Sequence, residues 1–156
     1  MTPDELMRRA IALSMEKMLD GSGGPFGAVI ARDGAIVAEG WNQVTSANDP
    51  TAHAEVVAIR RACQALGRFA LGDCEIYTSC EPCPMCLGAI YWARLGRIWF
   101  GNDRGDAAAI GFDDDFLYHE LPRPIAARSI PTQRLLGDEA RAAFDAWRMK
   151  EDRMAY

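Results

Sequence analysis

Short strand-like segments alternate with longer amphipathic segments along most of this chain, and this alternation limits the possible folds more than any other feature. Apolar residues recur at helical spacing over Pro3–Asp20, over Ala52–Leu66 and again after Pro82. Runs typical of strands lie between them, at residues 28–31, 36–38, 74–78 and 97–100. A chain of this kind buries its apolar surface by packing the helices on the faces of a sheet. We therefore predict an α/β layered fold.

Turn residues indicate how the first two strands are joined. Asp33-Gly34 separates them, and Asp-Gly between apolar segments is a strong signal for a two-residue hairpin. Beyond Gly101 the pattern weakens, although Asp113–Asp115 suit the start of a short helix. A last helix is predicted at about 138–156, because an apolar stripe runs through Ala140, Ala143, Phe144 and Trp147. The chain has 156 residues, enough for one domain that we predict to span 1–156.

Two short motifs, each at the start of a predicted helix, carry metal-ligating side chains. The first is His53-Ala54-Glu55, and the second is Pro82-Cys83-Pro84-Met85-Cys86. Side chains in a first turn lean back toward the helix start, so the imidazole and both thiols can converge on one point. One histidine with two cysteines is a ligand set typical of Zn²⁺. We predict a zinc ion held by His53, Cys83 and Cys86, with one tetrahedral position open.

Glu55 is the residue that makes this predicted metal site a catalytic one. An open position on zinc holds water, and the metal lowers the pKa of that water to about 7. A carboxylate beside it takes the proton and delivers it to a ring nitrogen and then to a departing amine. The order H-x-E followed by P-C-x-x-C is the signature of zinc enzymes that deaminate nucleobases. We therefore predict Glu55 as the proton carrier of a hydrolytic deaminase.

The same motifs allow two alternatives, a closed metal site with a fourth cysteine ligand and a binding protein that zinc only stabilises. If Cys80 were a fourth ligand, it would close the coordination sphere and abolish the chemistry, so we predict a buried thiol at a strand end. Cys63 and Cys74 are predicted in the core, and His119 on the surface. A zinc-stabilised binding module would keep the same ligands but would have no use for Glu55.

Charge, hydropathy and cysteine content limit the cellular compartment and the kinds of partner that we expect. The net charge of −5 argues against a protein that grips phosphate, so we expect no nucleic acid partner. No segment approaches the roughly 20 apolar residues of a membrane span, and no signal segment opens the chain, so we expect a soluble, cytoplasmic protein. Five cysteines, of which Cys80, Cys83 and Cys86 cluster, suit a metal site better than disulfides.

A family resemblance agrees with the motifs. Thr51–Glu55, Thr78–Cys86 and Gly88–Arg94 resemble the cytidine deaminase superfamily. The resemblance narrows to its bacterial guanine deaminase branch, over essentially the whole chain, through Gly24–Ala28, Asn48–Thr51, Gly111–Asp114 and Tyr156. It implies a three-layer α/β/α sandwich around a central five-stranded mixed sheet. It also implies one Zn²⁺ per subunit and hydrolysis of guanine, a small purine base, to xanthine and ammonia.

The same resemblance implies how guanine is bound. Phe26 and the His53 ring would lie against the faces of the base, although Phe26 could equally be a core residue. Asn42 and the backbone amide of Ala54 would meet the carbonyl and ring-nitrogen edge, although Asn42 could be only a turn residue. Asp114 would accept from ring N–H groups. A carboxylate there suits guanine and would repel the ring-nitrogen acceptors of adenine.

The resemblance further implies a homodimer formed by C-terminal exchange. The last helix would cross to a second subunit and place Tyr156 in the pocket of its neighbour, with the segment 121–131 as the hinge. The alternative is a helix that packs on its own subunit. Trp92 is predicted as a wall of the substrate pocket, or else as a core residue.

A tRNA adenosine deaminase is the nearest rival, because it shares both motifs. Such an enzyme should carry basic surface near its C-terminus, whereas here basic and acidic residues are mixed over 145–153 and Asp113–Asp115 would repel RNA. Cytosine or an aminated triazine stays possible as a substrate, since each presents an amino group on a six-membered ring.

Overall fold

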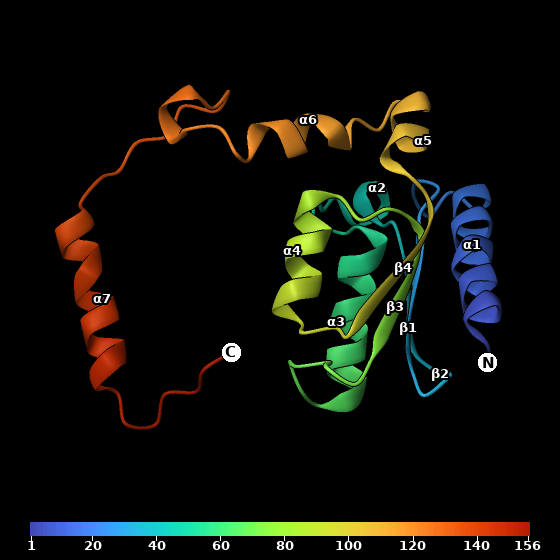
Figure 1. Ribbon diagram of the computed structural model, residues 1–156, viewed down its shortest axis with the longest axis horizontal. Helices are drawn as coiled ribbons and strands as arrows, with labels where there is room; N and C mark the ends of the chain where they lie inside the picture. The colour runs from blue at the N-terminus through green and yellow to red at the C-terminus, as the bar shows by residue number, and fades with distance from the viewer. The chain divides into compact units, whose positions relative to one another are not determined.

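The computed structural model describes residues 1–156, which form two units, Met1–Leu117 and Tyr118–Tyr156. A mixed sheet of four strands is the middle layer of the first unit, with the order β2-β1-β3-β4 (Figure 1). The strands are β1 (Gly27–Arg32), β2 (Ala35–Trp41), β3 (Glu75–Cys80) and β4 (Arg97–Asn102). Strand β1 is antiparallel to β2 and β3, whereas β3 and β4 are parallel.

Helices cover both faces of this sheet, so the predicted α/β layering is confirmed. On one face lies α1 (Pro3–Leu19), and on the other lie α3 (Ala54–Leu66) and α4 (Pro84–Trp92) (Figure 1). The buried side of α1 is Leu6, Ala10 and Leu13, which pack with Val29 and Tyr77. The helical spacing that predicts this helix from the sequence runs through Met7, Ala10, Ile11, Ser14 and Met18. Of these residues Ala10 is fully buried and Met7 packs against the cluster, whereas Ile11 and Met18 are exposed.

The prediction of a fifth strand is wrong. After β4 the chain forms two short helices, α5 (Arg104–Ala109) and α6 (Asp114–Glu120). Asp103 starts α5 by a capping box: its side chain accepts from the backbone N–H of Asp106, and the Asp106 carboxylate accepts from the N–H of Asp103. This reciprocal cap satisfies backbone donors that a strand would have offered to the sheet edge.

The predicted hairpin between the first two strands is confirmed. Asp33 and Gly34 both have positive φ, 49° and 76°. Two consecutive residues with positive φ are the requirement of a type I′ turn, whose twist matches that of the strands. The turn therefore sets the pairing of Arg32 with Ala35, and a register shift between Ile30 and Ala31 then brings Gly27 opposite Trp41. One further short helix, α2 (Val44–Ala47), follows the hairpin.

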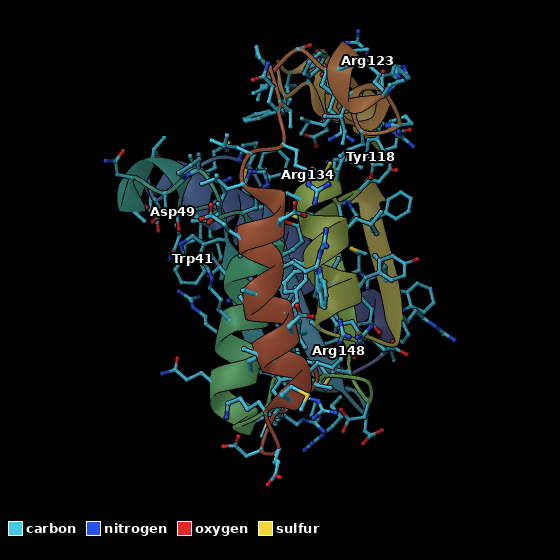
Figure 2. The ribbon with its side chains drawn as sticks, turned by 90° about the vertical axis from the view of Figure 1, so that its left-hand side faces the viewer. Trp41, Asp49, Tyr118, Arg123, Arg134 and Arg148 are labelled. Carbon is cyan, nitrogen blue, oxygen red and sulfur yellow. The ribbon has the colours of Figure 1, made fainter.

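The second unit contains the end of α6, a 3-10 turn η1 (Ile125–Ala127) and α7 (Gly137–Met149). The predicted last helix is present but shorter than expected. Lys150 leaves the helical conformation at φ −73° and ψ 115°, where the apolar stripe also stops. Arg148 pairs with Asp145 one turn earlier on α7 (Figure 2). The single domain expected over 1–156 remains a prediction, and the structure divides into two units.

None of the helices combines the length and the apolar character needed to cross a membrane.

On the sheet face that carries α3, the core is built from small side chains. Ala54, Ala58 and Ala62 on α3 are fully buried against Ala28 and Ile30 of β1. Small residues let the helix lie close to the sheet, which fixes the position of its N-terminal end.

Gly40 on β2 tests this close packing. A Cβ atom on Gly40 would lie 2.2 Å from the carbonyl oxygen of Ala54 and 2.6 Å from the nitrogen of Ala58. We expect Gly40→Ala to lower the free energy of unfolding by about 1–3 kcal/mol, measured by urea denaturation. Gly88→Ala on α4 is the control, because its Cβ would meet nothing within 4 Å. An unchanged urea midpoint for Gly40→Ala would contradict the packing described.

Candidate active site

Two helix starts supply the metal-ligating side chains. His53 is the N-cap of α3, with φ −68° and ψ 155°, and Cys83 is the N-cap of α4, with φ −66° and ψ 166°. Neither side chain makes the hydrogen bond that an N-cap usually accepts from the first turn. The backbone thus has the cap conformation at both helices while the imidazole and the thiol remain available to a ligand.

The three predicted ligands lie together. Nδ1 of His53 is 3.5 Å from Sγ of Cys83 and 3.5 Å from Sγ of Cys86, and all three ligand atoms lie within 4.8 Å of one another. A tetrahedral Zn²⁺ with ordinary Zn–N and Zn–S bonds separates nitrogen from sulfur by about 3.6 Å. The geometry and the chemistry of this donor set therefore fit zinc.

Cys80 lies outside this cluster. Its thiol is buried at the end of β3 and points to the carbonyl oxygen of Asp103, 3.8 Å away. Burial raises the pKa of the Cys80 thiol to about 11, and the nearby Glu55 charge adds to the effect. These features are those of the buried strand-end thiol that the sequence suggested, not those of a thiolate ligand.

Charge within the cluster favours a thiolate at Cys83. The hydrogen bond from the Cys86 thiol, with a further contribution from the His53 ring, lowers the pKa of Cys83 to about 4. The Cys83 contact also raises the pKa of His53 and, together with burial, that of Cys86. The three groups share protons among themselves, and a divalent cation between them would replace those protons.

Glu55 lies in the first turn of α3, beside the cluster. It is 6% exposed, and its carboxyl oxygens lie 3.4 Å from Oγ1 of Thr78 and 3.4 Å from Sγ of Cys86. Thr78 donates its only proton to the carbonyl oxygen of Cys80 at 2.8 Å. Burial raises the pKa of Glu55 above its usual range. A carboxyl group with a raised pKa is suited to accept a proton in one step and donate it in another.

A cavity of about 270 Å³ opens beside the cluster. Six of the residues predicted for the site line it: Phe26, Asn42, His53, Glu55, Cys83 and Asp114. They come from five different parts of the chain, so the fold brings together positions that the sequence separates. Cys80 also lines the cavity, and Cys86 and Ala54 are fully buried.

Asn42 has a fixed orientation in the cavity wall. Its Oδ1 accepts hydrogen bonds from the backbone N–H of Gly24 at 3.3 Å and of Val44 at 3.2 Å. Because both partners are donors, the amide oxygen is assigned by its surroundings. The amide nitrogen of Asn42 is therefore the side-chain group with which it can donate to a ligand.

Asp114 begins α6 and supplies a carboxylate to the same cavity. Burial raises the pKa of the Asp114 carboxyl, and the negative charge at Cys83 raises it further. A ligand that donates N–H groups to this carboxylate would stabilise its charged form.

Phe112 is a cavity residue to which sequence reasoning gave no role. It packs edge-on against Phe26, with ring centroids 4.9 Å apart and planes at 88°. The two rings form an apolar corner, and an edge-to-face pair of this kind is favourable. Its nearness to Phe26 comes from the turn after α5, where the N–H of Phe112 donates to Ala107. Glu81 is a second lining residue to which the sequence motifs assign no role.

Trp92, predicted as a wall of the substrate pocket, does not line this cavity. Trp92 is the last residue of α4, 63% exposed, with the Arg94 guanidinium 5.9 Å from its ring. Two turns of helix separate it from the ligand end of α4, about 12 Å along the axis. It is therefore neither cavity wall nor core within the first unit. Tyr156 belongs to the second unit, and its contact with substrate stays a prediction.

Comparison with known proteins agrees with this site. The family model for the cytidine and deoxycytidylate deaminase zinc-binding region matches residues 1–102. The guanine deaminase of Bacillus subtilis (strain 168) is 52% identical over 156 residues, all of both chains. A tRNA-specific adenosine deaminase of Haemophilus influenzae is 37% identical over 124 residues, 76% of this chain and 71% of that protein.

Solved structures give the same result. The X-ray structure of guanine deaminase from Bacillus subtilis matches with a TM-score of 0.97, covering 100% of this chain and 99% of that one. A guanine deaminase structure from Nitrosomonas europaea matches with a TM-score of 0.70 at 32% identity, covering 79% of this chain and 68% of that one. The chain therefore belongs to the cytidine and deoxycytidylate deaminase family of zinc-binding proteins.

Proposed function

We propose that this protein hydrolyses free guanine to xanthine and ammonia. The observation that carries the proposal is a single cavity that joins a zinc-type ligand set, a buried carboxyl group at Glu55 and a second carboxylate at Asp114. The Bacillus subtilis relative, similar over the whole of both chains, is a guanine deaminase, which supports guanine as the substrate.

His53, Cys83 and Cys86 would hold one Zn²⁺ per subunit. When bound, zinc lowers the pKa of water to about 7 and so makes a nucleophile available at neutral pH. Glu55 carries the protons. Its carboxylate takes one proton from the attacking water and delivers it to the ring nitrogen next to the amino-bearing carbon. It then takes the second proton from the hydroxyl group added to that carbon and delivers it to the amino group, so that the C–N bond breaks, a carbonyl forms and ammonia leaves. The raised pKa of Glu55 suits a group that must both accept and donate.

The cavity wall matches the edges of guanine. The amide nitrogen of Asn42 donates to the carbonyl oxygen of the base, and the backbone N–H of Ala54 serves the same edge. Asp114 accepts from ring N–H groups. Phe26, supported by Phe112, and the His53 ring pack on the faces of the base. An acceptor at Asp114 disfavours adenine, because an unpaired buried polar group costs about 1–3 kcal/mol.

A panel of amino-bearing substrates tests this function. We expect the zinc-loaded protein to release ammonia from guanine much faster than from adenine, cytosine, an aminated triazine, guanosine or a tRNA, measured by a coupled ammonia assay. Faster release from the tRNA would favour the rival, adenosine deamination in RNA. No release from any member of the panel would indicate a binding module and would overturn the proposal.

Glu55→Gln separates the proton carrier from the metal site. The amide keeps the size of the side chain but cannot carry a proton, so we expect turnover to fall by about 10²–10⁴-fold. Zinc content, measured by atomic absorption, should stay near that of the parent, because Glu55 is not a ligand. Turnover near the parental value in a folded, zinc-loaded Glu55→Gln protein would remove Glu55 from the mechanism.

We also propose that two copies of the chain form a homodimer by exchange of the C-terminal segment. Within its own unit, α7 leaves apolar side chains without a core, with Phe144 75% and Trp147 43% exposed. In the first unit, Tyr91 and Trp92 on α4 are 70% and 63% exposed. A second copy would cover both surfaces, and Tyr156 of each chain would then meet the substrate pocket of the other.

Sedimentation measures this assembly directly. We expect the full chain to sediment as a dimer at micromolar concentration. The double variant Phe144→Ser, Trp147→Ser should sediment as a monomer, because exchange would no longer bury apolar side chains. The double variant Arg141→Ser, Arg148→Ser, on the same helix, is the control and should remain dimeric. A monomeric parent chain would contradict the exchange.

A further inference from the structure

One guanidinium joins the loop that carries a metal ligand to the helix that carries Asp114. Arg104 lies within ion-pair distance of Glu81, two residues before Cys83, and of Asp115, the residue after Asp114. We propose that Arg104 is a positioning residue that sets the place of the Asp114 carboxylate in the cavity and so the affinity for the base. This inference rests on the proposed function, because it assumes that Asp114 binds substrate.

On the metal side, Glu81 is bound to Arg104 through both of its oxygens. Oε2 accepts from the backbone N–H of Arg104 at 3.0 Å, and Oε1 lies 3.5 Å from the guanidinium Nε. The Glu81 side chain is 22% exposed, and its own N–H donates to the carbonyl oxygen of Asn102 at 2.8 Å. The Glu81 carboxylate is therefore fixed against the start of α5.

On the substrate side, the guanidinium reaches the first turn of α6. Nη1 of Arg104 is 3.8 Å from Oδ1 of Asp115. Asp113 stabilises the same turn, because its Oδ1 accepts a hydrogen bond from the backbone N–H of Phe116 at 3.2 Å. Because Asp114 lies between these two residues, the orientation of its side chain depends on the turn that Arg104 and Asp113 hold.

The position of Arg104 is itself well defined. It is the first residue of α5 and follows Asp103, whose capping box fixes the start of that helix. Its side chain is 41% exposed and that of Asp115 is 47% exposed. Ion pairs this exposed contribute little to stability, so loss of the guanidinium should leave the fold intact. Positioning is more sensitive, because a displacement of about 1 Å near a reacting group can cost up to about 10²-fold.

A double-mutant cycle between Arg104 and Asp114 tests the proposal. We expect Arg104→Met to raise the KM for guanine by about tenfold while kcat, zinc content and Tm change little. Asp114→Asn should raise the KM at least as much. In the Asp114→Asn background, adding Arg104→Met should change the KM by less than about twofold, because Arg104 acts through Asp114.

Two further variants complete the design. Asp115→Asn removes the charge on α6 that pairs with the guanidinium and should reproduce the KM change of Arg104→Met, which keeps the test valid if Arg104→Met folds poorly. Arg8→Met is the control, because Arg8 pairs only across an exposed turn with Asp4 on α1. Its KM should equal that of the parent.

The outcomes are separable from those of the proposed function. Additive KM effects of Arg104→Met and Asp114→Asn would overturn the inference while guanine turnover by the parent still supports the function. An unchanged KM in both Arg104→Met and Asp115→Asn would also overturn it. A parent chain that does not deaminate guanine would defeat the proposed function itself, whatever the variants do.

Discussion

The chemistry of this protein depends on two helix starts that lie close together, with metal-ligating residues in the cap positions. His53 and Cys83 have the backbone conformation of an N-cap, yet neither side chain bonds to its own first turn. An N-cap hydrogen bond is typically worth about 1 kcal/mol, so both helices give up local stability. In exchange, the positive ends of both helix dipoles lie beside a cluster that must hold thiolate charge. The hydrogen bond from the Cys86 thiol adds to this effect by lowering the pKa of Cys83.

Close packing makes that arrangement possible. Gly40 lets α3 approach β2 so nearly that a methyl group would collide with the Ala54 carbonyl oxygen. Buried alanines on the same face of α3 continue the contact, and the start of the helix is thereby fixed over the end of the sheet. Strand β3 ends there at Cys80, so the chain reaches Cys83 after two further residues. The imidazole and the thiols meet because α3 begins at the same edge of the sheet at which β3 ends.

Local signals predicted the cluster of His53, Cys83 and Cys86 well and its surroundings less well. The spacing of His53, Glu55, Cys83 and Cys86 is read within short windows, and helix geometry alone makes those side chains converge. Phe112 and Glu81 were missed because their roles arise from α5, a helix of six residues with no apolar periodicity to reveal it. The capping box of Asp103 and Asp106 was the available signal for that helix. Residues whose neighbours come from distant segments cannot be assigned from spacing, since no local pattern records the contact.

The C-terminal segment obeys a different constraint from the rest of the chain. A helix of 13 residues, such as α7, is marginal by itself in water, and most helical stability in proteins comes from packing an apolar face. Within residues 118–156, α7 contains no buried residue. Its apolar face therefore stabilises the helix only if Phe144 and Trp147 pack on a surface outside that unit. Exchange between subunits satisfies this requirement and would also bring Tyr156 to an active site. Substrate affinity and subunit assembly would then be coupled through the same segment.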